Sequence, residues 1–435
     1  MIRDIPFELP WRQENKGDVL GTIWSTRNMD FKKELGFVSP TYKLLVTTLS
    51  GDTDNPTDLA VGFCKESGTI GAFSSTYWWA VAGTSVYATA TESGDFDEDD
   101  SGSLPVTGGK SAVDVKSFNG RVYVSSDRNL WRRTGTTYTT VSTALPNDKK
   151  ILEVYGDRLY IASDDQVDSI DVAETLATTT YTLDINQATN ENLSISCMRK
   201  VSNGLWIATY NNQGGRAKVM FWDGVTQDTV EVLKEVESGM IMAMSIKDDV
   251  PYILDNRGVL SAYNGSFFEE VARIDLDYKQ LYRFDTFSNN DRWIHYNGMQ
   301  TIDDEILFAI NTRMKDTDDK QIPRTPSGVY AYNPSIGIYH KFAFTAQRDD
   351  TTVTDMGQLE VVEVGGIYSM VDDEENDLRE EQSDFFVAFA YKSDNSTTKY
   401  AIAKSDKRGL DVNSASRTVA GAITTTKWFA DEVEE

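Results

Sequence analysis

The chain has 435 residues and a formal net charge of −26 at pH 7, with 68 acidic against 42 basic side chains. Nucleic-acid binding needs Lys and Arg side chains that neutralise phosphates, so the sequence predicts no nucleic-acid partner. Attraction to an anionic membrane surface is disfavoured for the same reason. With only two cysteines, Cys64 and Cys197, we expect neither a disulfide framework nor a structural zinc site.

Residues 1–50 differ from the rest of the chain and form the first predicted segment. Pro6 and Pro10 lie in an extended arm without an apolar core region, so we expect no signal peptide. No window approaches the roughly 18 apolar residues of a membrane-spanning helix. Two stretches, DVLGTIWSTRNMDF and YKLLVTT, are typical of strands. The arm either adds a strand to the last blade of the domain that follows or lies on a neighbouring subunit.

A unit of alternating apolar strand, short polar turn and second strand recurs about seven times over residues 51–410. Its clearest copies span residues 120–134, 157–171, 204–222 and 250–263. A single hairpin buries too little apolar surface to be stable, whereas stacked copies bury a continuous core. The repeat therefore predicts an all-β protein with a β-propeller of about seven blades, and six or eight blades remain open.

Fainter copies extend the series before and after the clear ones. Equivalent strand positions are spaced by 44, 37, 46, 46, 55 and 61 residues, and they are Trp79, Tyr123, Tyr160, Trp206, Tyr252, Leu307 and Tyr368. The first values match a four-stranded blade of about 40–50 residues. The larger values require insertions, for which residues 321–328 and 372–384 are polar candidates. An acidic stretch at residues 92–103 is predicted to be a loop between the first two blades.

Residues 411–435 form the third predicted segment, the start of a β-rich C-terminal extension. ITTTKWF is typical of the first strand of a further sheet, and the acidic DEVEE follows it. We expect the native chain to continue past Glu435, and a frayed acidic tail is the alternative.

Few residues are candidates for catalysis. The only histidines, His295 and His340, lie among aromatic residues and are expected to be packed strand residues rather than members of a catalytic triad. Carboxylates are abundant, so a pair suited to glycoside cleavage remains open, but none stands out from the 68 present. We therefore predict no catalytic, cofactor-binding or metal-binding residue and a protein that is not an enzyme.

Three local motifs have both a structural and a functional reading. SSDRNLWRRTG resembles the Asp-box turn of sialidase-like propellers, although Asn129 replaces its glycine. Alternating Asp95, Asp97 and Asp99 could form a weak surface calcium site, but they lack the glycine and glutamate of an EF-hand loop, so a solvated loop is expected. Adjacent Trp78 and Trp79 point to opposite faces of a strand, so at least one should lie between blades.

The repeat resembles β-propeller structural proteins of tailed bacteriophages. The stretches that carry the resemblance cover residues 118–274, and they are NGRVYVSSDRNLWR, VYGDRLYIAS, ISCMRKVSNGLWIATYNNQGGRAKVMFWDG and IKDDVPYILDNRGVLSAYNGSFFEEVARI. The resemblance implies a virion component, tail-associated and assembled in the bacterial cytoplasm. Its partners would be other virion proteins in a symmetric multi-copy assembly, with a host-surface glycan as a further candidate partner. No functional residue carries over from the family.

Two other functions remain open at this point. A carbohydrate-binding or glycoside-cleaving propeller would hold a sugar in a central cleft between paired carboxylates. A soluble scaffold would instead bind a single cellular protein. Because one fold hosts many functions, the repeat alone does not choose among them.

Overall fold

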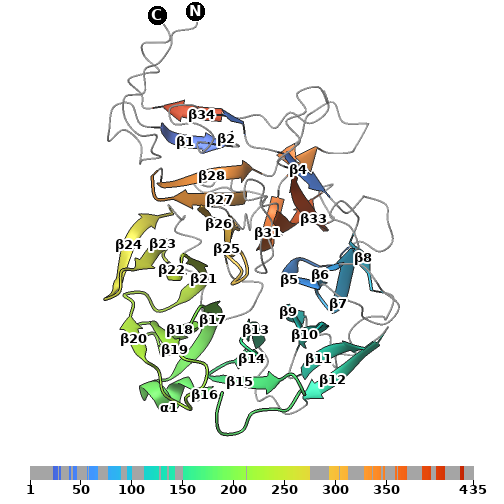
Figure 1. Ribbon diagram of the computed structural model, residues 1–435. Coiled ribbons are helices and arrows are strands. Elements are labelled where there is room, and N and C mark those ends of the chain that lie inside the picture. The colour runs from blue at the N-terminus through green and yellow to red at the C-terminus, as the bar shows by residue number, and fades with distance from the viewer. Residues whose placement is uncertain are drawn as a thin grey trace, which may run out of the picture.

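The computed structural model describes residues 23–27, 29–30, 39–40, 43–46, 56, 58–66, 77–89, 96–99, 112–126, 129–134, 137–142, 150–211, 213–274, 293–302, 304–311, 328–335, 337–343, 346–347, 358–359, 361–369, 385–392, 398–406 and 422–425. Seven four-stranded antiparallel sheets stand around a common centre (Figure 1). The prediction of an all-β propeller with seven blades is confirmed. The one helix in this part of the chain is α1 (Ile185–Thr189), which lies beside the outer strand of blade three.

Each blade begins with its innermost strand and ends at the periphery. The strands of blades one to four are, in order, β5 (Ala60–Glu66), β6 (Tyr77–Ala82), β7 (Ser85–Thr89), β8 (Asp97–Glu98); β9 (Ala112–Phe118), β10 (Arg121–Ser126), β11 (Asn129–Thr134), β12 (Thr137–Ser142); β13 (Lys150–Tyr155), β14 (Arg158–Ser163), β15 (Gln166–Asp171), β16 (Leu183–Asp184); and β17 (Leu193–Val201), β18 (Gly204–Asn211), β19 (Lys218–Trp222), β20 (Val232–Glu235). The strands of blades five to seven are β21 (Ile241–Lys247), β22 (Val250–Asp255), β23 (Val259–Tyr263), β24 (Phe268–Arg273); β25 (Met299–Ile302), β26 (Glu305–Ile310), β27 (Gly328–Asn333), β28 (Gly337–Ala343); and β31 (Val361–Ser369), β32 (Phe385–Lys392), β33 (Thr398–Asp406) with β4 (Lys43–Val46).

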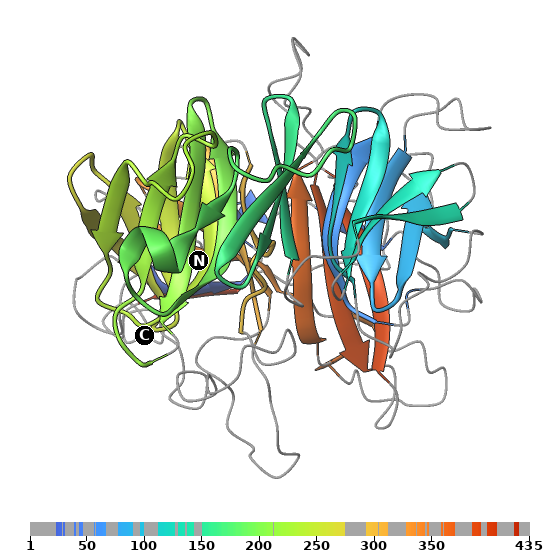
Figure 2. The same cartoon turned by 90° about the horizontal axis from the view of Figure 1, so that it is seen from below.

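The inner strands contact one another in chain order around the ring, and β31 of blade seven contacts β5 of blade one. Seen from below, the sheets pack face against face (Figure 2). Blade seven approaches blade one closely, since a Cβ at Gly366 would lie 2.7 Å from the Val61 carbonyl oxygen. The inner hairpin turns use residues that tolerate positive φ, such as Asn119 with Gly120 in blade two.

The N-terminal segment closes the ring. Its strand β4 pairs antiparallel with β33 and supplies the outer strand of blade seven, with Leu44 opposite Ser405. Of the two roles considered for the arm, completion of the last blade is the one observed. A strand shared between the chain ends removes the exposed edge that an open blade would leave.

The two ends of the chain also meet outside the ring. Strand β1 (Ile23–Arg27) pairs with β34 (Ala422–Thr425), and this terminal sheet lies beside β28 of blade six (Figure 1). Both strands fall in stretches predicted to be β structure. Four further short strands form two pairs: β2 (Met29–Asp30) with β3 (Ser39–Pro40), and β29 (Ala346–Gln347) with β30 (Gln358–Leu359).

The structure corrects two sequence-based assignments. Tyr368 lies on the first strand of its blade, whereas the other six equivalent positions lie on second strands. The stretch at residues 92–103 is not only a loop, because Asp97–Glu98 forms the fourth strand of blade one. The two predicted insertions, apart from Gly328, lie outside the described residues.

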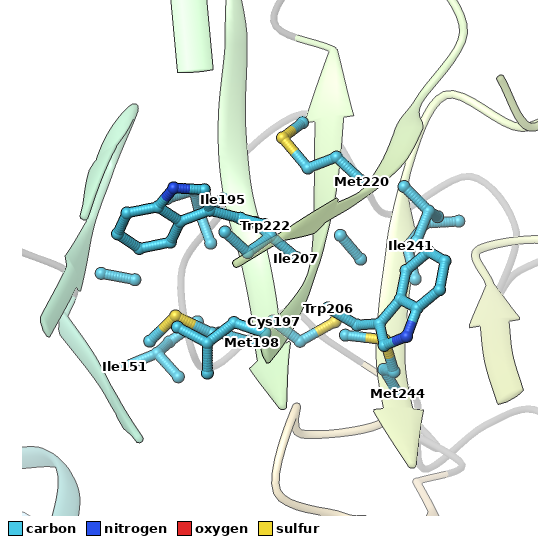
Figure 3. Packing of buried hydrophobic residues seen from close by; sticks show 14 of the residues in the cluster. Ile151, Ile195, Cys197, Met198, Trp206, Ile207, Met220, Trp222, Ile241 and Met244 are labelled. Carbon is cyan, nitrogen blue, oxygen red and sulfur yellow. The ribbon is translucent and has the colours of Figure 1, made fainter. Parts of the chain in front are cut away.

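Most of the core lies between neighbouring blades. Figure 3 shows the largest cluster, in which the side chains of blade four fill the space on both of its faces. Trp222 lies on the side of Ile151 of blade three, and Trp206 lies on the side of Met244 of blade five. Each blade therefore needs both neighbours to bury its two faces, and a gap anywhere would expose core.

Removing the closing strand should open the ring. A chain that lacks residues 1–47 loses β4 and leaves the edge of β33 unpaired. We therefore expect either aggregation or a loss of stability on the order of several kcal/mol, which lowers the thermal midpoint by about 10 °C or more. Differential scanning calorimetry and light scattering measure both effects. A truncation of residues 1–20, which ends before β1, is the control. Equal midpoints for the two truncations would contradict closure by β4.

Candidate functional site

A six-residue stretch just before blade six crosses the centre of the ring. We call residues 293–298 the central segment. The Tyr296 hydroxyl donates a 2.8 Å hydrogen bond to the Val113 carbonyl of blade two, and the Ile367 amide of blade seven donates to the Asn297 carbonyl at 2.9 Å. The Ala309 amide of blade six donates to the Gly298 carbonyl at 2.7 Å. The segment is thus hydrogen-bonded to strands on opposite sides of the ring.

The Asn297 side chain lies between two buried charges. Its Nδ2 donates to Asp114 Oδ1 at 3.0 Å and to the Val61 carbonyl of blade one at 3.2 Å. Its Oδ1 accepts from Nη2 of Arg199 at 3.1 Å. One amide therefore joins blades one, two and four, and separates a carboxylate from a guanidinium that do not touch.

Both charged groups are buried and their hydrogen-bonding capacity is used. Arg199 also donates to the carbonyl oxygens of Met244 in blade five and Tyr296 in the central segment, at 3.1 and 2.8 Å. Asp114 Oδ2 accepts from the Leu152 amide of blade three at 3.0 Å. Burial raises the pKa of Asp114, although the charge of Lys116 and the Leu152 amide act against that shift. The hub, defined as the central segment with Asp114 and Arg199, touches all seven blades.

The aromatic residues that define the sequence repeat form a second set of contacts between blades. On the second strand of five successive blades, each packs against the end of the third strand, or the corner after it, in the next blade. The pairs are Trp79 with Arg133 (4.7 Å, ring to guanidinium carbon), Tyr123 with Glu174 (2.8 Å hydrogen bond), Tyr160 with Gly224 (2.8 Å hydrogen bond), Trp206 with Tyr263 (5.1 Å between ring centres) and Tyr252 with Tyr332 (6.2 Å).

The junction of blades two and three holds a compact ion cluster. Glu174 accepts hydrogen bonds from the Tyr123 hydroxyl and from the guanidinium groups of Arg121 and Arg132. Desolvation opposes ionisation here, but these donors outweigh it and lower the pKa of Glu174 to about 2. The carboxylate stays charged at any physiological pH, so this cluster is a fixed link rather than a proton donor.

The junction of blades one and two contains an unusual carboxyl group. Arg133 makes a 2.8 Å ion pair with Asp99, which also accepts from the Tyr138 hydroxyl at 2.8 Å. Glu66 is buried nearby, and its Oε1 has no hydrogen-bond partner. Burial raises the pKa of Glu66 to about 7, and the charge of Arg133 limits the rise. No pattern in the sequence singles out Glu66.

The structure places the sequence candidates as follows. His295 is packed, as expected, but in the central segment rather than a strand, where its Nδ1 accepts from the Asn297 amide at 3.2 Å. His340 lies on β28, and its side chain is outside the described residues. Trp78 and Trp79 are buried at two different blade interfaces, on opposite faces of β6.

The two turn motifs have a structural explanation. The stretch similar to an Asp-box joins β10 to β11, and Asp127 itself lies outside the described residues. Of the alternating acids, Asp99 is engaged with Arg133 rather than solvated, and Asp95 is not described. Within the described part of the chain, no three His, Cys, Asp or Glu side chains cluster in a way that could hold a metal ion. That part also contains no helix long and apolar enough to cross a membrane.

Comparisons with known proteins support the fold alone. No family model and no curated protein matches the chain. One similar solved structure is the extracellular domain of a one component system protein from B. thetaiotaomicron, with 11% identity and a TM-score of 0.50 over 84% of this chain, which spans 40% of that one. Another is the WD40 propeller domain of Doa1, with 10% identity and a TM-score of 0.47, which covers 84% of this chain and 98% of that one. A third is BamB from Moraxella catarrhalis, with 13% identity and a TM-score of 0.41, which covers 92% of this chain and 97% of that one. The chain is a seven-bladed β-propeller, and this likeness carries no function to it.

Replacing the bridging amide should weaken the whole ring. Asn297→Ala removes hydrogen bonds to blades one, two and four and leaves Asp114 and Arg199 partly unsatisfied, so we expect a loss of about 2–4 kcal/mol. Chemical unfolding followed by circular dichroism measures it. Gln213→Ala, which changes an exposed amide between β18 and β19 of blade four, is the control, and equal unfolding midpoints for the two variants would refute the role of the hub.

The stability of the protein should depend on pH through Glu66. The pKa of Glu66 is about 7 in the folded protein against an ordinary 4.5. Its favourable contribution to the free energy of unfolding is therefore complete below about pH 4.5 and is lost as pH rises through 7. Glu66→Gln abolishes that ionisation and should stabilise the protein by roughly 1–3 kcal/mol at pH 8, with little effect at pH 4.5. Thermal unfolding at both pH values measures it. The exposed Glu235→Gln serves as control, and a pH-independent difference for Glu66→Gln would exclude this explanation.

Proposed function

We propose that this chain is a structural component of a bacteriophage virion, associated with the tail and acting through protein–protein assembly rather than catalysis. The observation that carries the proposal is the filled centre of the ring. The blades of a propeller surround a central channel. Here the hydrogen-bonding groups of the hub, at that centre, are already used to join the blades. Partners therefore bind to the outer surfaces, which are the corners, the peripheral strands and the loops.

The position of the chain ends supports an assembly role. The terminal sheet brings β1 and β34 together beside blade six, outside the ring. In the described residues β1 lies between β34 and blade six, whereas β34 is paired only with β1, so the other edge of β34 is one at which a strand of another subunit can add. Such a joint lets a rigid ring attach to its neighbours without disturbing its own core.

The sequence resemblance to phage propeller proteins supplies the virion context. It covers residues 118–274, which correspond to most of blades two to five. A host-surface glycan is a further ligand that the resemblance suggests for the loops, in keeping with the use of loops on a rigid scaffold for binding.

Electron microscopy of purified phage particles tests the proposal. An antibody raised against this chain, detected with gold, should label one fixed position on the tail, and mass spectrometry of the same particles should find the chain in a constant ratio to the capsid protein. Particles from an unrelated phage are the negative control. Abundant chain in the lysate with none in the particles would overturn the virion role and favour a glycan-binding or glycan-cleaving propeller.

A further inference from the structure

Three exposed apolar side chains occupy the same kind of position in three successive blades. Val172, Val225 and Phe267 lie in the connections between the third and fourth strands of blades three, four and five, with 51%, 44% and 56% of their surface exposed. We call them the corner row. The other exposed large apolar side chains of the described residues, Leu233 and Val271, lie on the outer strands of blades four and five. Single exposed apolar residues are ordinary, but their recurrence at one place in the repeat is not.

The three corners are built alike. Each is ordered by an Asp or Asn side chain whose oxygen accepts two backbone N–H groups from the residues that follow. The bonds are Ala173 and Thr175 to Asp171 (both 2.9 Å), Val225 and Thr226 to Asp223 (both 2.8 Å), and Ser266 and Phe267 to Asn264 (both 3.0 Å). This arrangement fixes the backbone that carries each apolar side chain.

The first two corners are also tied to the blade before them. The Val172 carbonyl accepts from Asn119 of blade two at 3.4 Å, and the Val225 carbonyl accepts from the Tyr181 amide of blade three at 3.0 Å. These bonds place the corners of successive blades on the same face of the ring. Because the backbone that carries the apolar side chains is held in position before a partner arrives, docking costs little backbone entropy.

The exposed charges around the corner row are predominantly acidic. The exposed charged side chains at the inner hairpins and outer connections on this side of blades three to five are five acids, Asp157, Glu231, Asp248, Asp249 and Glu269, and one base, Lys200. Two copies of a chain with net charge −26 repel each other, so this surface does not suit a second copy. Complementarity requires a positively charged partner.

We propose that the corner row, with Leu233 and Val271, is the docking surface for a protein segment in which Lys or Arg side chains flank apolar residues. The inference rests on the proposed assembly role and assigns it to one face of blades three to five. The apolar side chains supply contact area, and the surrounding acids select a basic partner and steer its approach.

Site-specific photo-crosslinking in the producing cells tests this surface. A benzophenone amino acid is placed at Gln227 or Ser266, each exposed within a corner, and at Gln213 on the opposite side of blade four as the control. We expect both corner probes to crosslink to the same segment of one protein, identified by mass spectrometry as basic and apolar, with at least a tenfold lower yield from the control probe. Combining the probes with Val172→Ser, Val225→Ser and Phe267→Ser should reduce that yield at least tenfold without changing the thermal midpoint.

The outcomes separate this inference from the proposed function. A shared basic segment supports the docking surface, whether or not the chain is found in particles. Crosslinks to a second copy of this chain, to unrelated segments, or to nothing would overturn it, even when particle labelling supports the virion role. Unchanged crosslinking in the triple serine variant would also overturn it.

Discussion

The Asn297 amide is the contact on which the ring depends most. It stands between the buried Asp114 carboxylate and the Arg199 guanidinium, and it satisfies one acceptor and one donor group at once. Without it, two charged groups would be buried with unused hydrogen-bonding capacity, which costs more than the bonds themselves gain. Because the same residues also bond to the inner strands, the polar centre and the apolar interfaces between the blades are stabilised together.

A second layer of contacts follows the sequence repeat itself. In blades one to five, the aromatic residue that marks the copy reaches from the second strand of its blade to the end of the third strand, or the corner after it, in the next one, as Tyr160 does to Gly224 and Trp206 to Tyr263. The repeat is therefore visible in the sequence because each of these five junctions holds a large side chain at the same place. These junctions hold the corners rigid, and the corners are where the molecule offers apolar surface to a partner.

The sequence predicted the propeller, its seven blades and the strands at both ends, because period-two alternation and a regular spacing report local pairing. It missed the hub, since Asp114 and Asn297 lie 183 residues apart and the stretch around His295 has the composition of an ordinary packed strand. It also misplaced Tyr368, because the hairpin of blade seven that is clearest in the sequence joins its first two strands rather than its middle pair. Burial of Glu66 likewise depends on a neighbouring blade that no local pattern reveals.

Amide hydrogen exchange across the ring tests the central claim most directly, namely that closure by β4 and the hub make the seven blades one cooperative unit. The account predicts that the inner strands β9, β17 and β31 exchange with the same free energy of opening, equal to that of global unfolding. An open array of repeats would fray from its ends. Markedly faster exchange in β31 than in β17 would contradict the account, because it would mean that blade seven opens on its own.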